Sequence, residues 1–349
     1  MRTLAQSQVV THIGVLTAGG DCPGLNAAIR GVVARAAAAG CRVSGIEDGW
    51  QGLMDGRVNP LGRDGVRGIL TRGGTILGTS RTDPYEHGDG LESLKPVLAD
   101  KEIDIVVVIG GDGSLRTAAR LGEEGLAVVG VPKTIDNDIE GTEISFGFDT
   151  AVQIVTDSID RLTTTAEAHN RIMVVEVMGR QSGWIAVSAG LAGGAEAILV
   201  PEEDYDLDDL ARRLLVRHNS GRDYSIVIVA EGVPEPSGNR VTMGTDHVGF
   251  ERLGGVSAVI AAELEARTGY ETRVMILGHL QRGGTPTAFD RVLATRMGIR
   301  AAEAAIDGDH GTMVACVGTD LVLVPLSPAV AVPRLVPGKR LAELTWFLA

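Results

Sequence analysis

The sequence predicts an α/β protein of doubly wound, mainly parallel sheets. Over most of the 349 residues, short apolar runs alternate with longer helix-like stretches, which is the pattern of βαβ units. The 47 glycines gather where these runs end. Open parallel sheets bind ligands at that edge, where glycine lets backbone amides approach phosphate. The length allows two domains, because single domains usually have about 100–200 residues.

Six apolar runs bounded by glycine and polar turns predict buried strands. They are His12–Thr17, Ile103–Ile109, Leu126–Val131, Arg171–Val177, Ser225–Ala230 and Thr272–Ile276. Between them, helices are predicted at Leu25–Ala39, Leu115–Leu121, Thr150–Leu162, Leu207–His218 and Val256–Arg267. The segment Gly232–Gly254 is rich in Gly, Pro and polar residues and predicts a surface insertion or a loop at an interface. After Val317, four prolines favour an irregular tail across the surface over further helices.

Charge and composition exclude several classes of partner. The formal charge of −13 disfavours nucleic acid or an anionic membrane, because both would be repelled. A phosphate ligand must therefore be held by local positive potential. The cysteines Cys22, Cys41 and Cys316 are too few and too scattered for a disulfide framework or a zinc site. The chain has neither a signal peptide nor an apolar stretch of the roughly 18 residues that span a bilayer, which predicts a cytoplasmic protein.

Two glycine-rich segments, each at a strand end that opens a helix, are candidates for phosphate binding. Thr17–Arg30 offers free amides and the positive end of a helix dipole, which suit a terminal phosphate. It lacks the Gly-Lys-Ser/Thr ending of a Walker loop and does not fit the dinucleotide Gly-x-Gly-x-x-Gly fingerprint. In Ile109–Ser114 the backbone can wrap the phosphates of a nucleotide, while Asp112 offers a carboxylate to Mg²⁺.

The segment Pro132–Asp138 follows a predicted strand and carries two carboxylates. Asp136 and Asp138 stand at positions i and i+2, so in a strand-like segment they share a face and reach different depths of one crevice. One can deprotonate a hydroxyl while the other supports metal-bound water. The alternative is a simple turn, since Asp and Asn favour turns.

Two further strand ends supply positive groups. Arg180, at the end of Glu176–Arg180, can stabilise charge on a transferring phosphoryl group. In Leu277–Gly284, His279 and Arg282 can donate hydrogen bonds to a second phosphate. A ligand with two phosphates needs several positive groups in an acidic protein. Three more arginines at the edges of predicted strands or loops are candidates: Arg81, Arg171 and Arg273.

Taken in this order, these segments resemble the phosphofructokinase family, and the resemblance runs from about Gly14 through Val324. It implies phosphorylation of fructose 6-phosphate at its 1-hydroxyl by ATP and Mg²⁺, the committed step of glycolysis. It also implies two Rossmann-like domains with the active site in the inter-domain cleft. The segments Arg252–Gly255 and Gly318–Asp320 are similar to the bacterial subgroup that mixes ATP-dependent and pyrophosphate-dependent members.

The resemblance also assigns the domains and the assembly. Residues 1–147, joined by roughly 281–330, are expected to bind the phosphoryl donor, and residues 148–280 the sugar phosphate. Residues 331–349 are expected to form a C-terminal tail. Arg171 and Arg273 match arginines that the family supplies from a neighbouring subunit, which implies a homo-oligomer, either a dimer or a tetramer.

The resemblance assigns a role to individual residues of this chain that match the family's motifs. Asp136 matches the general base, and Thr134 and Arg180 are the other expected catalytic residues. Asp112 matches the Mg²⁺ carboxylate, with Asp138 on the metal side through water. The expected donor contacts are Gly20, Arg81, Thr82, Gly111, Asp112, Gly113 and Ser114. The expected sugar-phosphate contacts are Thr134, Ile135, Asp136, Arg171, Met178, Gly179, Arg180, Glu231, Arg273, His279, Leu280, Gln281 and Arg282.

Two residues that bear on the phosphoryl donor point to different donors. The family associates Gly113 with ATP, because a larger acidic side chain there fills the space of the α-phosphate, and it associates Lys133 with pyrophosphate. We give Gly113 more weight, since a steric block is harder to evade than one added charge. The sequence thus predicts ATP, with pyrophosphate as the alternative. Thr82 and Glu86 replace an aromatic and a basic residue found near the adenine in relatives, which leaves purine selectivity open.

The residues of the family's effector site are only partly present. Arg30 and Arg63 match arginines of regulated bacterial members, but Ala34 and Thr163 replace two others. Because fewer positive groups weaken a phosphate pocket, we expect little response to ADP or phosphoenolpyruvate.

Three other functions are compatible with parts of the pattern. One is a reversible, pyrophosphate-dependent enzyme, and another is a kinase for a different sugar phosphate, such as sedoheptulose 7-phosphate. A non-catalytic nucleotide-binding regulator belongs to a different class. The intact set of Asp112, Asp136 and Arg180 disfavours it.

Overall fold

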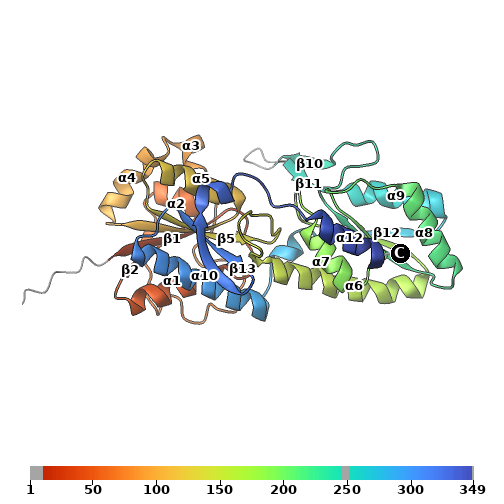
Figure 1. Ribbon diagram of the computed structural model, residues 1–349, viewed down its shortest axis with the longest axis horizontal. Coiled ribbons are helices and arrows are strands. Elements are labelled where there is room, and N and C mark those ends of the chain that lie inside the picture. Colours follow the sequence, from red (N-terminus) through yellow and green to blue (C-terminus); the bar gives the residue numbers. More distant parts are fainter. Residues whose placement is uncertain (1–10, 246–250, 348–349) are drawn as a thin grey trace, which may run out of the picture. The chain divides into compact units, whose positions relative to one another are not determined.

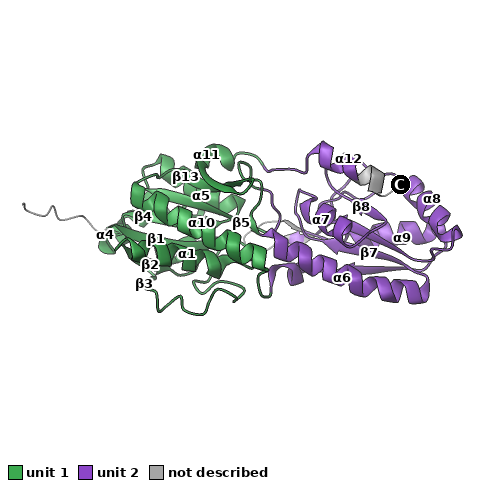
Figure 2. Cartoon of the chain, turned by 60° about the horizontal axis from the view of Figure 1, so that its bottom comes forward, with its two compact units in different colours: residues 1–134, 139–146, 284–332 green, residues 135–138, 147–283, 333–349 purple. Residues whose placement is uncertain are grey.

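The computed structural model describes residues 11–245 and 251–347, which form two compact units (Figure 2). Of the described residues, unit 1 contains those up to 134 together with 139–146 and 284–332. Unit 2 contains 135–138, 147–283 and those from 333 onwards. The chain therefore passes between the units several times, and residues far apart in the sequence meet within each one.

Unit 1 is built on a sheet with the strand order β14-β13-β5-β4-β1-β2-β3, and β6 pairs with β5. The bounds are β1 His12–Ala18, β2 Arg42–Ile46, β3 Val58–Pro60, β4 Ile105–Gly110, β5 Val128–Thr134, β6 Phe146–Gly147, β13 Thr312–Val317 and β14 Asp320–Pro325. The central pairs β1–β2, β1–β4, β4–β5 and β5–β13 are parallel, and the edge pairs β2–β3 and β13–β14 are antiparallel. The expected mainly parallel α/β sheet is confirmed.

Helices cover both faces of this sheet. They are α1 Leu25–Ala38, α2 Gly49–Met54, α3 Pro84–His87, α4 Leu91–Asp100, α5 Asp112–Glu123, α10 Ala288–Asp307 and α11 Leu326–Ala329. Figure 1 shows α1 and α10 on one side of the sheet and α2, α4 and α5 on the other. On the second side, Leu16, Val106 and Val108 are fully buried against these helices. Since β1, β4 and β5 are buried on both faces, they appear in the sequence as nearly continuous apolar runs.

Two glycines allow α1 and α10 to approach closely. A Cβ atom at Gly31 of α1 would lie 2.5 Å from the carbonyl oxygen of Thr295, and one at Gly298 of α10 would lie 2.2 Å from that of Ala28. Both distances are shorter than any real Cβ contact. The helix pair therefore needs glycine at these two positions.

Unit 2 has an all-parallel sheet with the strand order β12-β7-β9-β8. Its strands are β7 Ile172–Val177, β8 Ala197–Leu199, β9 Ser225–Ala230 and β12 Thr272–Ile276, and a separate hairpin contains β10 Thr242–Thr245 and β11 Glu251–Leu253. The helices are α6 Phe148–His169, α7 Trp184–Ala192, α8 Leu207–Asn219, α9 Val256–Thr268 and α12 Gly338–Phe347, with the 3-10 turn η1 at Gly278–Arg282. The expected doubly wound parallel fold is confirmed here too.

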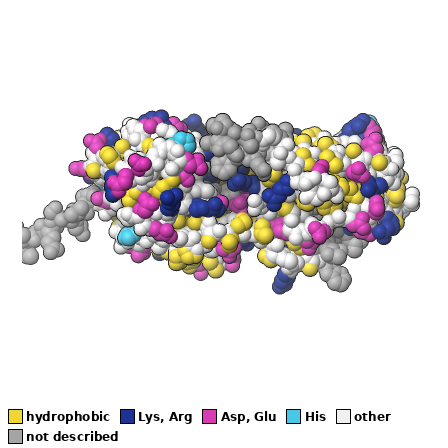
Figure 3. All heavy atoms as spheres, turned by 90° about the horizontal axis from the view of Figure 1, so that it is seen from above, with side chains coloured by type: hydrophobic (Ala, Val, Ile, Leu, Met, Phe, Trp, Pro, Cys, Tyr) yellow, Lys and Arg dark blue, Asp and Glu magenta, His cyan; other side chains and the backbone are white. Residues whose placement is uncertain are grey.

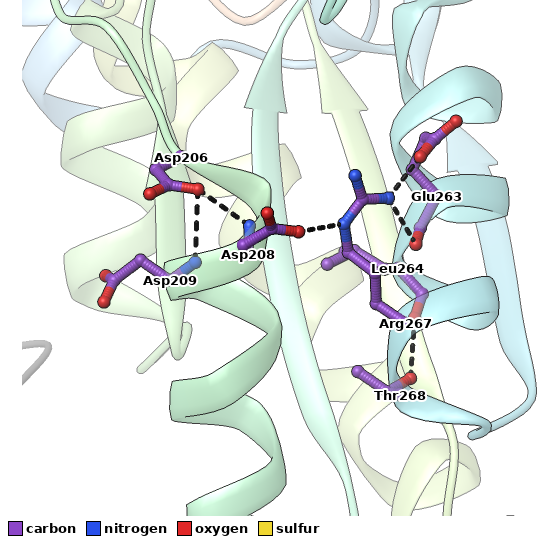
Figure 4. Close-up of polar contacts among 7 residues, drawn as sticks. All are labelled: Asp206, Asp208, Asp209, Glu263, Leu264, Arg267 and Thr268. Atoms are coloured by element: carbon purple, nitrogen blue, oxygen red, sulfur yellow. Dashed lines mark hydrogen bonds and ion pairs between the residues drawn. The ribbon is translucent and has the colours of Figure 1, made fainter.

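Helices α8 and α9 are joined at the surface by charged side chains (Figure 4). The Nε of Arg267 on α9 donates to Asp208 on α8 at 2.7 Å, and its Nη1 pairs with Glu263 one turn earlier on α9. Asp206 caps α8 by accepting from the amides of Asp208 and Asp209 at 2.8 and 3.3 Å. Exposed ion pairs of this kind stabilise little, so apolar burial of the two helices determines their place.

The surface carries side chains of both charges, although the net charge is negative. On the face drawn in Figure 3, acidic, basic and hydrophobic side chains are interspersed over each unit. None of the helices in residues 11–245 and 251–347 is long and apolar enough to cross a membrane.

The structure corrects the expected irregular tail after Val317, which contains β14, α11 and α12. The prolines occupy places that regular structure tolerates. Pro325 is the last residue of the edge strand β14, and Pro337 directly precedes the first residue of α12. The sequence analysis also predicts no helix at the position of α10. The segment Gly232–Gly254, expected as an insertion or loop, contains the β10–β11 hairpin, and residues 246–250 lie outside the described part.

Candidate active site

The register of unit 1 brings three of the expected site segments to one sheet edge. Ala18 at the end of β1 pairs with Gly110 at the end of β4, and Gly110 pairs with Pro132 near the end of β5. The turns that follow these residues are therefore neighbours. The expected donor contacts are found here: Gly20 and Gly111 lie in these turns, and Asp112, Gly113 and Ser114 begin α5. Lys133 is the next residue of β5 after Pro132.

The turn after β1 requires glycine and is tied to the segment around Arg81. Gly19 has φ +82°, in the left-handed region that side chains disfavour. Its amide donates to the carbonyl of Ser80 at 2.9 Å, and Thr79 Oγ1 donates to its carbonyl at 2.6 Å. Arg81 follows directly and is exposed, while Thr82 donates to Gln51 Oε1 at 3.2 Å.

Lys133 is buried beneath this turn. Its side chain is 3% exposed, and its Nζ contacts the carbonyl oxygen of Gly20. A Cβ atom at Gly19 or at Gly111 would lie 3.7 or 3.9 Å from the same Nζ. One cation thus lies under both glycine-rich turns, where a donor's phosphates are expected.

Asp112 and Gly113 are the first two residues of α5, and Gly113 is exposed. A Cβ atom at Gly113 would meet nothing within 4 Å, so the position has open space. The carboxylate of Asp112 is partly exposed and accepts two bonds from Arg116 Nη2, at 2.9 and 2.6 Å. Mg²⁺ is usually held by one or two carboxylates together with substrate phosphates. Asp112 fits that role, because an exposed ion pair with Arg116 is weak enough to be exchanged.

The Thr134–Asp138 run leaves β5 as a buried segment. In unit 2, Asp136 and Asn137 are only 4% and 3% exposed, and Asn137 has φ +52°. Ser182 Oγ lies 3.2 Å from the carbonyl oxygen of Asp136 and 3.2 Å from that of Gly179. Asp136 is therefore held to the turn that follows β7, which is the turn of Arg180.

Close backbone packing fixes this second turn. Arg180 has φ +54° and is exposed, and its amide donates to Glu231 Oε1 at 3.1 Å. A Cβ atom at Gly232 would lie 1.9 Å from the carbonyl oxygen of Arg180, and one at Gly179 would lie 2.3 Å from that of Ser182. These glycines let the turns after β7 and β9 meet.

The carboxyl group of Glu231 has a raised pKa. Burial, followed by the negative charge of Asp136, raises its pKa to about 7 from the ordinary value of 4.5. The amides of Arg180 and Gly179 and the charge of Arg282 oppose this rise. Glu231 can therefore hold a proton near neutral pH beside the ionisable Asp136.

The third loop of unit 2 follows β12. Gln281 is fully buried, with its Oε1 accepting from the amide of Met178 at 3.3 Å and its Nε2 donating to the carbonyl of Gly278 at 3.1 Å. His279 and Leu280 are exposed, and Arg282 is partly buried. The expected sugar-phosphate residues of all three loops therefore follow the carboxyl ends of β7, β9 and β12.

Arg171 and Arg273 are not part of this group. They stand at the amino ends of β7 and β12, at the other end of the sheet from Met178 and Gly278, and both pair with Glu271. Within the chain the structure does not bring them to the other sugar-phosphate residues. Their expected role toward a neighbouring subunit stays a prediction.

Two residues that hold the site together, Ser182 and Glu176, have no role assigned in the sequence analysis, although Glu176 begins the segment Glu176–Arg180. Ser182 lies two residues after the predicted site segment Glu176–Arg180, in the same turn, so its position near that segment is a signal that could have found it. Glu176 is 2% exposed and accepts from the amides of Gly255 and Ser257 and from the hydroxyl of Ser257, which joins β7 to the start of α9.

Comparison with known proteins gives consistent matches over most of the chain. Residues 12–305 match the family model described as phosphofructokinase. The chain is 52% identical over 340 residues to the pyrophosphate–fructose 6-phosphate 1-phosphotransferase of Amycolatopsis methanolica, covering 96% of this chain and 99% of that one. It is 50% identical over 338 residues to the ATP-dependent 6-phosphofructokinase 3 of Streptomyces coelicolor, covering 95% and 98%.

A solved structure extends the match to three dimensions. Pichia pastoris phosphofructokinase in the T-state superposes with a TM-score of 0.83 at 32% identity. The match covers 99% of this chain and 37% of the Pichia chain, so this protein spans well under half the length of that relative.

Proposed function

The chain belongs to the phosphofructokinase family, and we propose that it transfers the terminal phosphoryl group of ATP to the 1-hydroxyl of fructose 6-phosphate. The observation that carries this proposal is the fixed arrangement around Asp136. Its carboxyl group lies on a buried run, its backbone is tied through Ser182 to the turn of Arg180, and its charge acts on Glu231. A base, a guanidinium and a second carboxyl are thus collected at one end of one sheet.

Residues of this chain have separate roles in the proposed phosphoryl transfer. Asp136 accepts the proton of the sugar hydroxyl as that oxygen forms a bond to the γ-phosphorus, and the bond from phosphorus to the bridging oxygen of ADP breaks with its electron pair. Arg180 balances negative charge on the transferring group. Asp112 is the residue that would hold Mg²⁺, which would neutralise charge on phosphate oxygens, and the resemblance to the family gives Asp138 a role on the metal side through water.

We assign donor binding to unit 1 and sugar-phosphate binding to unit 2. Support comes from the glycine-rich turns over Lys133 in the first unit and the loops of Met178, Glu231 and Arg282 in the second. We also propose a cytoplasmic homo-oligomer in which Arg171 and Arg273 serve the neighbouring subunit's site. A weak response to ADP or phosphoenolpyruvate belongs to the same proposal.

Pyrophosphate is the second candidate donor, and Lys133 is the observation that favours it. An ammonium group at the carbonyl of Gly20 is placed to compensate the charge of a compact diphosphate. The open space at Gly113 instead supports ATP, since nothing of the protein blocks an α-phosphate there.

Turnover of purified protein tests the function. Fructose 6-phosphate is supplied with ATP, GTP or pyrophosphate in parallel, sedoheptulose 7-phosphate replaces it in a second series, and the phosphorylated sugar is measured. We expect fructose 1,6-bisphosphate with ATP as the best donor. Failure of every donor with both sugars would contradict the proposal and favour a non-catalytic nucleotide-binding protein.

A paired substitution tests the base. Asp136→Ser is expected to lower kcat by about 10²–10⁴-fold, the usual contribution of a positioned base. Asp160→Ser removes an exposed carboxylate from α6 of the same unit and is the control. Equal activity of the two variants, with substrate affinities unchanged, would refute the role of Asp136.

A further inference from the structure

The C-terminal segment around Arg334 is held against the run that carries Asp136. The amide of Arg334 donates to the carbonyl of Asp138 at 2.8 Å, and its Nη1 donates to the carbonyl of Asn137 at 3.1 Å. One residue thus binds two consecutive carbonyls of the run. Arg334 and Asn137 are 197 positions apart in the sequence and lie in the same compact unit.

The run needs support at this place. Asn137 has φ +52°, a backbone conformation that costs energy for a residue with a side chain, although asparagine tolerates it better than most. It is 3% exposed, so water cannot readily replace lost hydrogen bonds to its carbonyl. The two bonds from Arg334 therefore stabilise the conformation that carries Asp136.

Arg334 is itself held by the start of α7. Trp184 Nε1 donates to the carbonyl of Arg334 at 3.2 Å, and the guanidinium carbon lies 4.2 Å from the centre of the Trp184 ring. A guanidinium over an indole face adds a cation–π attraction. Trp184 is 7% exposed, so this contact is largely shielded from water.

A second attachment lies two residues further along the C-terminal segment. The amide of Val336 donates to Glu202 Oε1 at 3.0 Å, and the same carboxylate accepts from the amide of Gly183 at 2.9 and 3.1 Å. Gly183 closes the turn that begins at Gly179 and carries Arg180 and Ser182. The segment 334–336 therefore joins the Asp136 run to the Arg180 turn.

We propose that Arg334 is a positioning residue for phosphoryl transfer, and that the segment 334–336 is a strap that fixes Asp136 relative to Arg180. This proposal rests on the function proposed above. The guanidinium of Arg334 acts through the carbonyl of Asn137, while its backbone amide, which a side-chain substitution leaves in place, binds the carbonyl of Asp138. Since small displacements of a catalytic group reduce the rate steeply, loss of the strap should lower kcat much more than it changes donor affinity.

The test compares Arg334→Ala with Arg340→Ala, which removes an exposed arginine from the same C-terminal segment. We expect kcat of Arg334→Ala to fall by about 10–10²-fold, with the KM for the donor within about threefold of the unaltered chain. Low millimolar guanidinium should restore part of the lost rate. Arg340→Ala should have the activity of the unaltered chain and no response to guanidinium.

Amide hydrogen exchange provides a readout that does not depend on activity. Exchange in residues 135–139 should become faster in Arg334→Ala, while the core strand β9 keeps its protection. Unchanged kcat and unchanged exchange would overturn the proposal. Equally faster exchange in β9, without rescue by guanidinium, would also overturn it by showing a general structural role.

The two proposals fail in different ways. If the unaltered chain phosphorylates no sugar with any donor, the proposed function fails, and the exchange comparison still decides whether the strap exists. If Arg334→Ala does not fold, Trp184→Phe replaces it, because this change removes the Nε1 donor and keeps an aromatic ring. A smaller loss of kcat with faster exchange in 135–139 supports the strap, and exchange equal to that of the unaltered chain overturns it.

Discussion

Glu231 offers a direct test of the electrostatics around Asp136. The pKa of its carboxyl group is raised to about 7 from 4.5, first by burial and then by the charge of Asp136. The folded chain thus binds this proton more tightly than the unfolded chain does. The stability that Glu231 contributes is fully present below about pH 4.5 and is lost as the pH rises through about 7.

The size of the effect follows from the shift. One pKa unit corresponds to about 1.4 kcal/mol, so a shift from 4.5 to about 7 costs the folded state on the order of 3 kcal/mol at alkaline pH. Glutamine cannot ionise and still offers an oxygen to the amide of Arg180. Glu231→Gln should therefore gain free energy of unfolding relative to the unaltered chain, by about 2 kcal/mol between pH 5.5 and pH 8.

Urea unfolding in phosphate-free buffer, at steps of pH from 5.5 to 8, measures this difference. Circular dichroism and tryptophan fluorescence give the midpoint and slope at each pH. The matched control is Glu203→Gln, which neutralises an exposed carboxylate of the same unit. A difference between Glu231→Gln and the unaltered chain that stays constant over this range would refute the reasoning, because only a displaced titration makes it depend on pH.

Two substitutions test the choice of donor, each assayed with ATP and with pyrophosphate at saturating fructose 6-phosphate. Gly113→Asp should lower kcat/KM for ATP by about 10³-fold and spare pyrophosphate, since a carboxylate near an α-phosphate costs roughly 4 kcal/mol at an effective dielectric of 20; equal losses with both donors would contradict this. Lys133→Met should lower kcat/KM for pyrophosphate about 10-fold more than for ATP, because a hydrogen bond to a charged group contributes about 1.5–3 kcal/mol. A larger loss with ATP would count against the assigned role of the ammonium.

The parts of the fold that could be predicted are those with a strong local pattern. Strands buried on both faces, such as β4 and β9, appear as continuous apolar runs, and β9 was placed at its observed bounds Ser225–Ala230. The site loops could be found for a related reason. Parallel strands end at a common edge, so glycine-rich and charged residues at strand ends converge there.

The missed elements lack such a pattern. Helix α10 is rich in alanine, which favours a helix but gives little contrast between a buried and an exposed face. Its close packing on α1 depends on Gly31 and Gly298, and glycine does not mark a helix in the sequence. Helix α12 differs from the expected irregular tail because a proline just before a helix leaves the hydrogen bonds of that helix intact.

The contacts of Arg334 could not be predicted from any local signal. Its partners Asn137 and Asp138 lie on the run after β5 and Trp184 at the start of α7, and only the folded chain brings the C-terminal segment to them. The catalytic motif itself gives no sign that its carbonyls need an outside donor. Residues that act on chemistry are found from their own type and spacing, whereas residues that position them are found from tertiary contacts.

The choice between ATP and pyrophosphate as phosphoryl donor also depends on individual side chains. Relatives named for pyrophosphate and for ATP are 52% and 50% identical to this chain, so overall similarity differs by only 2 percentage points between the two chemistries. The donor must therefore depend on a few side chains beneath and beside the glycine-rich turns of unit 1. Lys133 already contacts the carbonyl of Gly20, which makes its ammonium part of the turn whichever donor binds. Gly113 has no side chain, and a Cβ atom built there would meet no atom within 4 Å, so the position itself is open. Steric overlap costs more than the loss of one charge contact, so the open position at Gly113 favours ATP.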